Sequence, residues 1–96
     1  MKNRSRTEIM SLILTSAYDD QVITTRKLMY KVHLSYSVLK EYLIILDEAG
    51  LIARSEEERC YRTTQKGVHF LQVYNQMTDM ILFPLQSKIE YLANNS

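Results

Sequence analysis

Residues 24–67, TTRKLMYKVHLSYSVLKEYLIILDEAGLIARSEEERCYRTTQKG, decide the fold of this chain. They predict two helices that are joined by only His33 and Leu34, and a charged β-hairpin that follows Gly50 without a linker. The start of a further helix comes directly after the hairpin. So tight a helix pair, backed by a small hairpin, is an arrangement that presents one helix to a groove.

Capping signals bound the predicted helices. Ser5 and Glu8 form an S-x-x-E capping box at the start of the first helix. Thr24 or Thr25 caps the second helix, and Ser35 caps the third. Gly50 suits the left-handed position of a Schellman ending. Apolar spacing of three and four residues predicts one buried stripe in each helix: Ile9, Leu12, Ile13, Ser16 and Ala17; Leu28, Met29 and Val32; Leu39, Tyr42, Leu43, Leu46 and Ala49.

The hairpin LIARS–EEE–RCYRT is predicted to have the three glutamates as its loop. In that register Ala53 lies opposite Tyr61 on one face. The other face of the hairpin then carries Arg54, Cys60 and Arg62. Residues 21–23, a short β-branched segment, are expected to pair with the hairpin as a third strand.

The last helix is predicted to begin at Thr63 or Thr64 and to kink or break near Pro84, because proline removes a helical hydrogen bond. From Thr64 to Phe83 it would be about 30 Å long, more than so small a core covers. Something else must bury the far half of its apolar stripe, which comprises Phe70, Tyr74, Met77, Ile81, Leu85 and Leu92.

We therefore expect residues 1–66 to form a winged helix-turn-helix domain and residues 67–96 to form a helix for dimerisation, since cyclic dimers predominate among homo-oligomers. The alternative is that this helix folds back over the first helix of its own chain. The predicted fold class is mostly α with a small β-hairpin wing. Two Gly and one Pro among 96 residues agree with a mostly helical chain.

Charge is distributed unevenly along the chain. The net charge is only +1, yet residues 1–40 hold seven Lys or Arg against three Asp or Glu. The basic character therefore belongs to the helix-turn-helix, which favours double-stranded DNA as a partner. The N-terminus lacks the apolar core of a signal peptide, and no apolar run is long enough for a membrane span. We expect a cytoplasmic, chromosome-associated protein without a membrane partner.

The exposed start of the second helix of such a pair enters the major groove of DNA. Here the candidate recognition residues are Ser35, Tyr36, Ser37, Lys40 and Glu41, with Ile44 further along. Hydroxyls and ammonium groups suit phosphates and base edges, whereas bidentate Arg, Asn and Gln contacts are missing. We therefore expect weak sequence preference. Candidate phosphate or wing contacts are Thr25, Arg26, Lys27, Lys31, Arg54, Arg59 and Arg62.

For two of these residues a structural role is an equal alternative to DNA contact. Ser35 would then act only as a cap, and Tyr36 would pack against the preceding helix. The three glutamates of the wing tip would repel phosphates or pair with the wing arginines. Two other functions also stay open. One is a winged-helix module that binds proteins instead of DNA, and the other is a ligand-sensing regulator with a pocket between its last helices.

Catalytic and metal chemistry find little support. No Gly-rich phosphate loop, nucleophile motif or isolated carboxylate pair is visible, so no enzymatic activity, cofactor or small-molecule ligand is predicted. His33, Cys60 and His69 lack the spacing of metal ligands, so no metal is predicted.

The chain resembles small archaeal winged-helix DNA-binding proteins with a long C-terminal antiparallel coiled coil. The matching pieces are RSRTEIMSLIL, TRKLMYKVHLSYSVLKEYLIILDEAGLI and YRTTQKGVHFLQVY, which span most of the sequence from residue 4 to residue 74. The resemblance implies a homodimer that presents two winged helices to duplex DNA in chromosome organisation or transcriptional control. It also implies DNA contacts from Ser35, Tyr36, Ser37 and Lys40, with Arg54 and Arg62 flanking the wing. The EEE wing tip and Pro84 depart from the family pattern.

Overall fold

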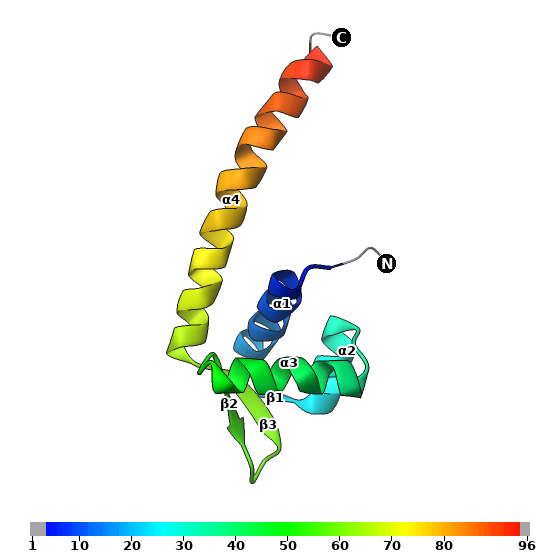
Figure 1. The fold of residues 1–96 in the computed structure, drawn as a ribbon, viewed down its shortest axis with the longest axis vertical. Helices are drawn as coiled ribbons and strands as arrows, with labels where there is room; N and C mark the ends of the chain where they lie inside the picture. Colours follow the sequence, from blue (N-terminus) through cyan, green and yellow to red (C-terminus); the bar gives the residue numbers. More distant parts are fainter. Residues whose placement is uncertain (1–3, 95–96) are drawn as a thin grey trace.

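The computed structural model describes residues 4–94, with the side chains of residues 83–86 left aside. Helices and strands follow in the order α1 (Arg6–Asp19), β1 (Ile23–Thr24), α2 (Thr25–Val32), α3 (Tyr36–Glu48), β2 (Ile52–Ser55), β3 (Cys60–Thr63) and α4 (Gln65–Asn94). Figure 1 shows α1, α2, α3 and the strands gathered into one body, from which α4 extends as a long rod. The predicted fold class is confirmed: a mostly helical chain with a small wing and a long C-terminal helix.

The predicted N-terminal caps are present. Ser5, Thr24 and Ser35 are the N-caps of α1, α2 and α3, and each hydroxyl accepts a hydrogen bond from the amide three residues further along, at 3.0, 3.3 and 3.4 Å. Such a cap satisfies one of the unpaired amides of the first turn and contributes about 1 kcal/mol. The boundaries of the helix-turn-helix thus follow from local side-chain chemistry.

Left-handed residues end α2 and α3. His33 (φ 55°) is the C-cap of α2, and its amide bonds to the carbonyl of Met29. Gly50 (φ 76°) follows α3, and the amide of Leu51 donates to the carbonyl of Leu46 at 2.9 Å, which confirms the Schellman ending. These two endings set the direction in which the chain enters and leaves α3.

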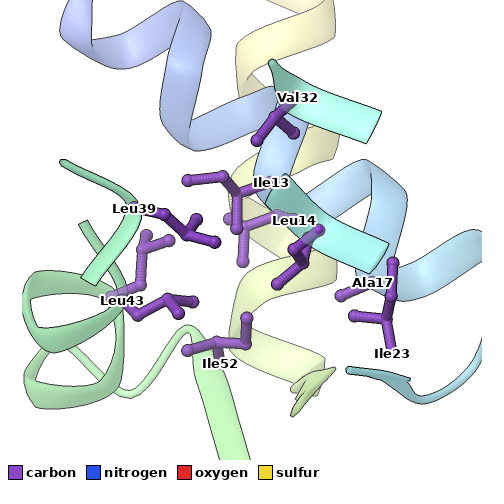
Figure 2. Packing of buried hydrophobic residues seen from close by; sticks show 10 residues of the cluster. Ile13, Leu14, Ala17, Ile23, Val32, Leu39, Leu43 and Ile52 are labelled. Carbon is purple, nitrogen blue, oxygen red and sulfur yellow. The ribbon is translucent and has the colours of Figure 1, made fainter. Parts of the chain in front are cut away.

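The core lies where α1, α2, α3 and the sheet meet. In Figure 2 the side chains of Ile13, Leu39 and Val32 converge from the three helices. Each fully buried Leu or Ile contributes roughly 1.5–3 kcal/mol. On α1 Leu14 is fully buried, although it is not part of the predicted stripe, whereas Leu12 is 37% exposed, because α1 packs against α2, β3 and α4 at once. The buried cluster comprises Ile13, Leu14, Ala17, Ile23, Leu28, Val32, Leu39, Leu43, Leu46 and Ile52.

The described strands form an antiparallel sheet in the order β1-β3-β2, which confirms the expected third strand. The predicted hairpin register is wrong by one residue, because Arg54, and not Ala53, pairs with Tyr61. Arg59 joins the three glutamates in a four-residue loop and adopts the left-handed conformation (φ 52°) that closes the turn. Arg54 and Arg62 therefore lie on opposite faces of the wing, not on one face as expected.

α4 is continuous from Gln65 to Asn94, so of the two alternatives expected near Pro84, a kink or a break, the break does not occur. A proline removes one hydrogen bond, whereas the turns on either side of it keep theirs, and the helix continues. At 1.5 Å per residue α4 is about 45 Å long. Among residues 4–94 no helix combines the length and the apolar character needed to cross a membrane.

The start of α4 is tied to the end of α3. The Thr64 hydroxyl accepts a hydrogen bond from the Gly67 amide at 3.0 Å and so caps α4. The Lys66 ammonium donates to the carbonyl of Ala49 at 2.6 Å, a cation at the negative end of the α3 dipole. At Gly67 the backbone of Leu51 approaches so closely that a side chain has no room. We call these contacts the α3–α4 joint.

Candidate nucleic-acid interface

A groove of about 570 Å³ lies between α3, the start of α2 and the β2–β3 hairpin. We call it the α3–wing groove. It is formed by the exposed side of α3 and by the face of the wing that carries Arg54. Its lining residues are Thr24, Thr25 and Arg26 from the start of α2; Tyr36, Lys40, Leu43, Ile44 and Asp47 from α3; and Arg54, Glu58, Arg59 and Tyr61 from the wing.

The α3–wing groove concentrates positive charge. Four of its side chains are basic and two, Asp47 and Glu58, are acidic, although the whole chain carries a net charge of only +1. A cleft lined mainly by one sign of charge attracts the opposite sign. The basic side chains are Arg26, Lys40, Arg54 and Arg59.

The wing register decides which arginines face the groove. Arg54 and Tyr61 pair across the hairpin and both line the groove, while the left-handed Arg59 lines it from the wing tip. Arg62 pairs with Ala53 and does not line the groove; it lines a second hollow of about 340 Å³ at the wing, which Arg54 and Tyr61 also border. Of the predicted wing arginines, Arg54 and Arg59 thus line the α3–wing groove and Arg62 does not.

On α3 the predicted recognition residues fall into two groups. Tyr36 is 54% exposed, and the Lys40 ammonium lies 6.0 Å from the centre of its ring, at the limit of a cation–π contact. Both residues line the α3–wing groove. Ser35, Ser37 and Glu41 are exposed but lie outside the groove lining, and Ser35 is also the cap of α3.

The basic residues of α2 are also divided. Thr25 and Arg26 line the groove, whereas Lys27 and Lys31 lie outside it and form ion pairs with Asp20 at 2.9 and 3.0 Å. Hydrogen bonds from Lys27 and Lys31 hold the pKa of the Asp20 carboxyl below its ordinary value. The charge of these two lysines is therefore partly neutralised within the molecule.

Sequence reasoning missed several groove residues. The sequence predicts Thr24 only as a cap, and Tyr61 only as a strand residue opposite Ala53. Asp47 follows Lys40 and Ile44 at helical spacing, a pattern that would have placed it on the same side of α3. A four-residue wing loop would have placed Tyr61 beside Arg54. Among residues 4–94 no group of three or more His, Cys, Asp or Glu side chains is arranged to hold a metal ion.

The apolar stripe of α4 divides into two parts. Phe70 packs against the core and stacks on Tyr74, with ring centres 6.4 Å apart, so the first turns of α4 lie against their own body and α1. Further along, Met77, Ile81 and Leu92 are 51%, 67% and 56% exposed. Leu85, which also belongs to the predicted stripe, lies outside the described side chains.

The helix-turn-helix, the wing and the groove between them define the class of the protein. The family model described as winged helix-turn-helix matches residues 3–82, and the chain belongs to this family. A search of curated proteins found no match.

Two solved structures share the fold. Sso10a-2, a DNA-binding protein from Sulfolobus solfataricus, superposes with a TM-score of 0.74 at 24% identity, over 93% of this chain and 96% of that one. A cysteine-to-serine mutant of Lactococcus lactis ZitR in complex with DNA has a TM-score of 0.63 at 23% identity. That match covers 98% of this chain and 63% of ZitR, so ZitR contains further sequence.

Proposed function

We propose that the chain binds double-stranded DNA as a homodimer with weak sequence preference, as a transcription regulator or chromosomal protein. It acts by binding and not by catalysis. The observation that carries this proposal is the α3–wing groove, where basic side chains from three elements line one cleft. The similarity in fold to a DNA-binding protein and to a protein solved in complex with DNA supports it.

In this proposal the exposed start of α3 enters the major groove, and the start of α2 lies along the phosphate backbone. Tyr36 and Lys40 face base edges, while Arg26, Arg54 and Arg59 hold phosphates on either side. Lys40 binds as a point charge, and no planar bidentate group accompanies it on α3. Sequence preference is weak for this reason.

The second copy is proposed to pair with α4. The six residues of the predicted stripe, taken together with Lys88, lie symmetrically about Ile81, because each position before it has a counterpart at the same separation after it. They are residues 70, 74, 77, 81, 85, 88 and 92. In an antiparallel pair centred on Ile81, Tyr74 of one chain meets Lys88 of the other. A parallel pair would instead bring Lys88 against its own copy, which like charges disfavour. The 11-residue repeat of Phe70, Ile81 and Leu92 favours a nearly straight or slightly right-handed pair.

A salt titration with random-sequence duplex tests DNA binding. If the dimer neutralises six to ten phosphates, its affinity should fall by about 10³–10⁵ between 50 and 200 mM salt. Affinity that is independent of salt would refute the proposal. Arg54→Gln and Arg62→Gln form a matched pair, because they remove the same charge from opposite faces of the wing. Only Arg54→Gln is expected to reduce the salt slope, by about 0.9 per protomer.

Cysteine cross-linking tests the dimer in a Cys60→Ser background. Lys88→Cys chains mixed with Tyr74→Cys chains should form a disulfide between unlike chains if the pair is antiparallel. Lys88→Cys chains alone should cross-link only in a parallel pair. A sedimentation mass of one chain at micromolar concentration would refute the dimer altogether.

The second candidate is a winged-helix module that binds a protein partner. The ion pairs of Lys27 and Lys31 with Asp20, and the presence of Asp47 in the groove, favour it, because they reduce the positive surface offered to phosphates. Absence of duplex binding at 50 mM salt by the folded dimer would support this candidate over the first.

A further inference from the structure

The end of α1 carries negative charge where helix electrostatics disfavours it. Asp19 is the last residue of α1 and Asp20 is its C-cap, and the last turn of α1 has no basic residue. Unpaired carbonyls give this end of a helix a partial negative charge, so carboxylates here are unfavourable. Asp20 breaks this local rule, so the reason for a carboxylate at this position has to come from outside α1.

Asp20 bridges two lysines of α2. The Lys27 ammonium lies 2.9 Å from one carboxylate oxygen, and the Lys31 ammonium lies 3.0 Å from the other. Lys27 and Lys31 are four residues apart on α2, so both side chains point toward the same carboxylate. The Asp20 side chain is 20% exposed, compared with 60% for Lys27 and 35% for Lys31. The carboxylate is therefore the enclosed partner, and the ammonium groups remain open to an external anion.

One member of this ion-pair cluster, Lys27, lies in the first turn of α2, which borders the α3–wing groove, whereas Lys31 lies in the last turn and reaches back to the same carboxylate. Thr25 and Arg26 line the groove, and Lys27 is the next residue of the same helical turn. A duplex seated in the groove would follow the start of α2, where the first helix of a helix-turn-helix crosses the backbone. Phosphates would then come within reach of the two ammonium groups that Asp20 holds.

We propose that Asp20 limits the affinity for DNA, because its carboxylate competes with phosphates for the ammonium groups of Lys27 and Lys31. This inference rests on the proposed DNA-binding function. While both lysines stay on Asp20, the cluster offers the duplex a single net positive charge. When they turn to phosphates, they leave an enclosed carboxylate unpaired, which is unfavourable. In either state part of their attraction to DNA is lost.

Asp20→Asn tests the proposal, with Asp19→Asn as the matched control. Both variants remove one negative charge at the same place, but within residues 4–94 only Asp20 is ion-paired with the lysines. Fluorescence anisotropy with a random-sequence 30-base-pair duplex, about three helical turns, measures the affinity between 50 and 200 mM salt. Asp20→Asn should bind roughly 2- to 30-fold more tightly than the wild type, the range expected for releasing two exposed ion pairs. Its salt slope should be steeper by up to about 1.8 per protomer, and Asp19→Asn should differ from the wild type by less than about twofold.

The double variant Lys27→Gln with Lys31→Gln completes the test. In that background Asp20→Asn should no longer increase affinity, because no ammonium groups remain to be released. Circular dichroism confirms that each variant is folded, and Asp20→Ser replaces Asp20→Asn if the latter is not, since the backbone at residue 20 is in the ordinary helical region.

Two outcomes would overturn the proposal and leave DNA binding intact. Equal affinities of Asp20→Asn and Asp19→Asn would show that the lysines do not reach the duplex. Weaker binding by Asp20→Asn would show that Asp20 positions the lysines for DNA and does not compete for them. Failure of the wild type and every variant to bind duplex at 50 mM salt would overturn both this inference and the proposed function.

Discussion

Replacing Gly67 by alanine should destabilise the chain, although alanine is the better helix former. A Cβ atom at this position would collide with the carbonyl oxygen of Leu51 and lie 2.6 Å from the Thr63 methyl group. The Leu51 carbonyl cannot rotate away as a side chain would, because it accepts a hydrogen bond from the Thr64 amide at 3.1 Å. The substitution therefore pushes α4 away from the end of α3.

The magnitude follows from two opposing effects. Overpacking costs roughly 1–3 kcal/mol, and a clash with fixed backbone belongs at the upper end of that range. The higher helix propensity of alanine offsets about 1 kcal/mol of this cost. The free energy of unfolding should fall by about 2 kcal/mol, which corresponds to a decrease in Tm of roughly 8–16 °C.

Urea and thermal unfolding followed by far-ultraviolet circular dichroism measure this change. The protein concentration is held constant, because self-association would itself alter the apparent stability. His69→Ala is the matched control, since His69 is exposed in the same turn of α4 and its replacement should leave stability unchanged or slightly raised. A Gly67→Ala variant as stable as the wild type would refute the reasoning that Leu51 holds α4 at this distance.

Three further predictions concern charge and backbone conformation. Lys27 and Lys31 lower the pKa of Asp20, so the stability that their ion pairs provide should be complete above the ordinary aspartate pKa of about 4 and lost as the pH falls through the lowered value. Unfolding at pH 7 and pH 3 should therefore show a smaller pH dependence for Asp20→Asn than for the wild type. His33→Gly should raise the free energy of unfolding by up to about 1 kcal/mol in urea, because glycine adopts φ 55° without strain; a decrease would contradict this. Lys66→Met should lower it by about 0.5–1 kcal/mol, because the last turn of α3 loses its cation, and equal urea midpoints would argue against that contribution.

Features that depend on neighbouring residues were predicted well from the sequence. Ser5, Ser35 and Gly50 act within one turn of the helix that they bound, so their roles can be read from local spacing. The burial of Leu39 and Leu46 follows likewise from helical periodicity. Periodicity was less informative for α1, where Leu14 takes the place expected for Leu12 because three elements cover this helix.

Features that depend on distant contacts or on one unusual dihedral angle were not predicted. The wing register depends on the left-handed conformation of Arg59, which no glycine or asparagine signals. The register in turn decides whether Arg54 reaches the groove. The ion pairs of Asp20 join residues on two different helices. Gln21, with φ 66°, adopts another left-handed conformation in the connection between them. Such pairs become visible only when the helices have been placed in space.

The α3–α4 joint affects the distance between the two DNA segments that the proposed dimer contacts. Because α4 begins on the end of α3, the separation and relative rotation of the two α3 helices in the proposed dimer are set by the length of the rod between them. Inserting 11 residues into α4 would lengthen it by about 16 Å while keeping nearly the same angular phase. Inserting five would turn the far end by about 140°. The spacing of preferred half-sites along a duplex should change with these insertions, because the length of α4 sets the distance between the two α3 helices.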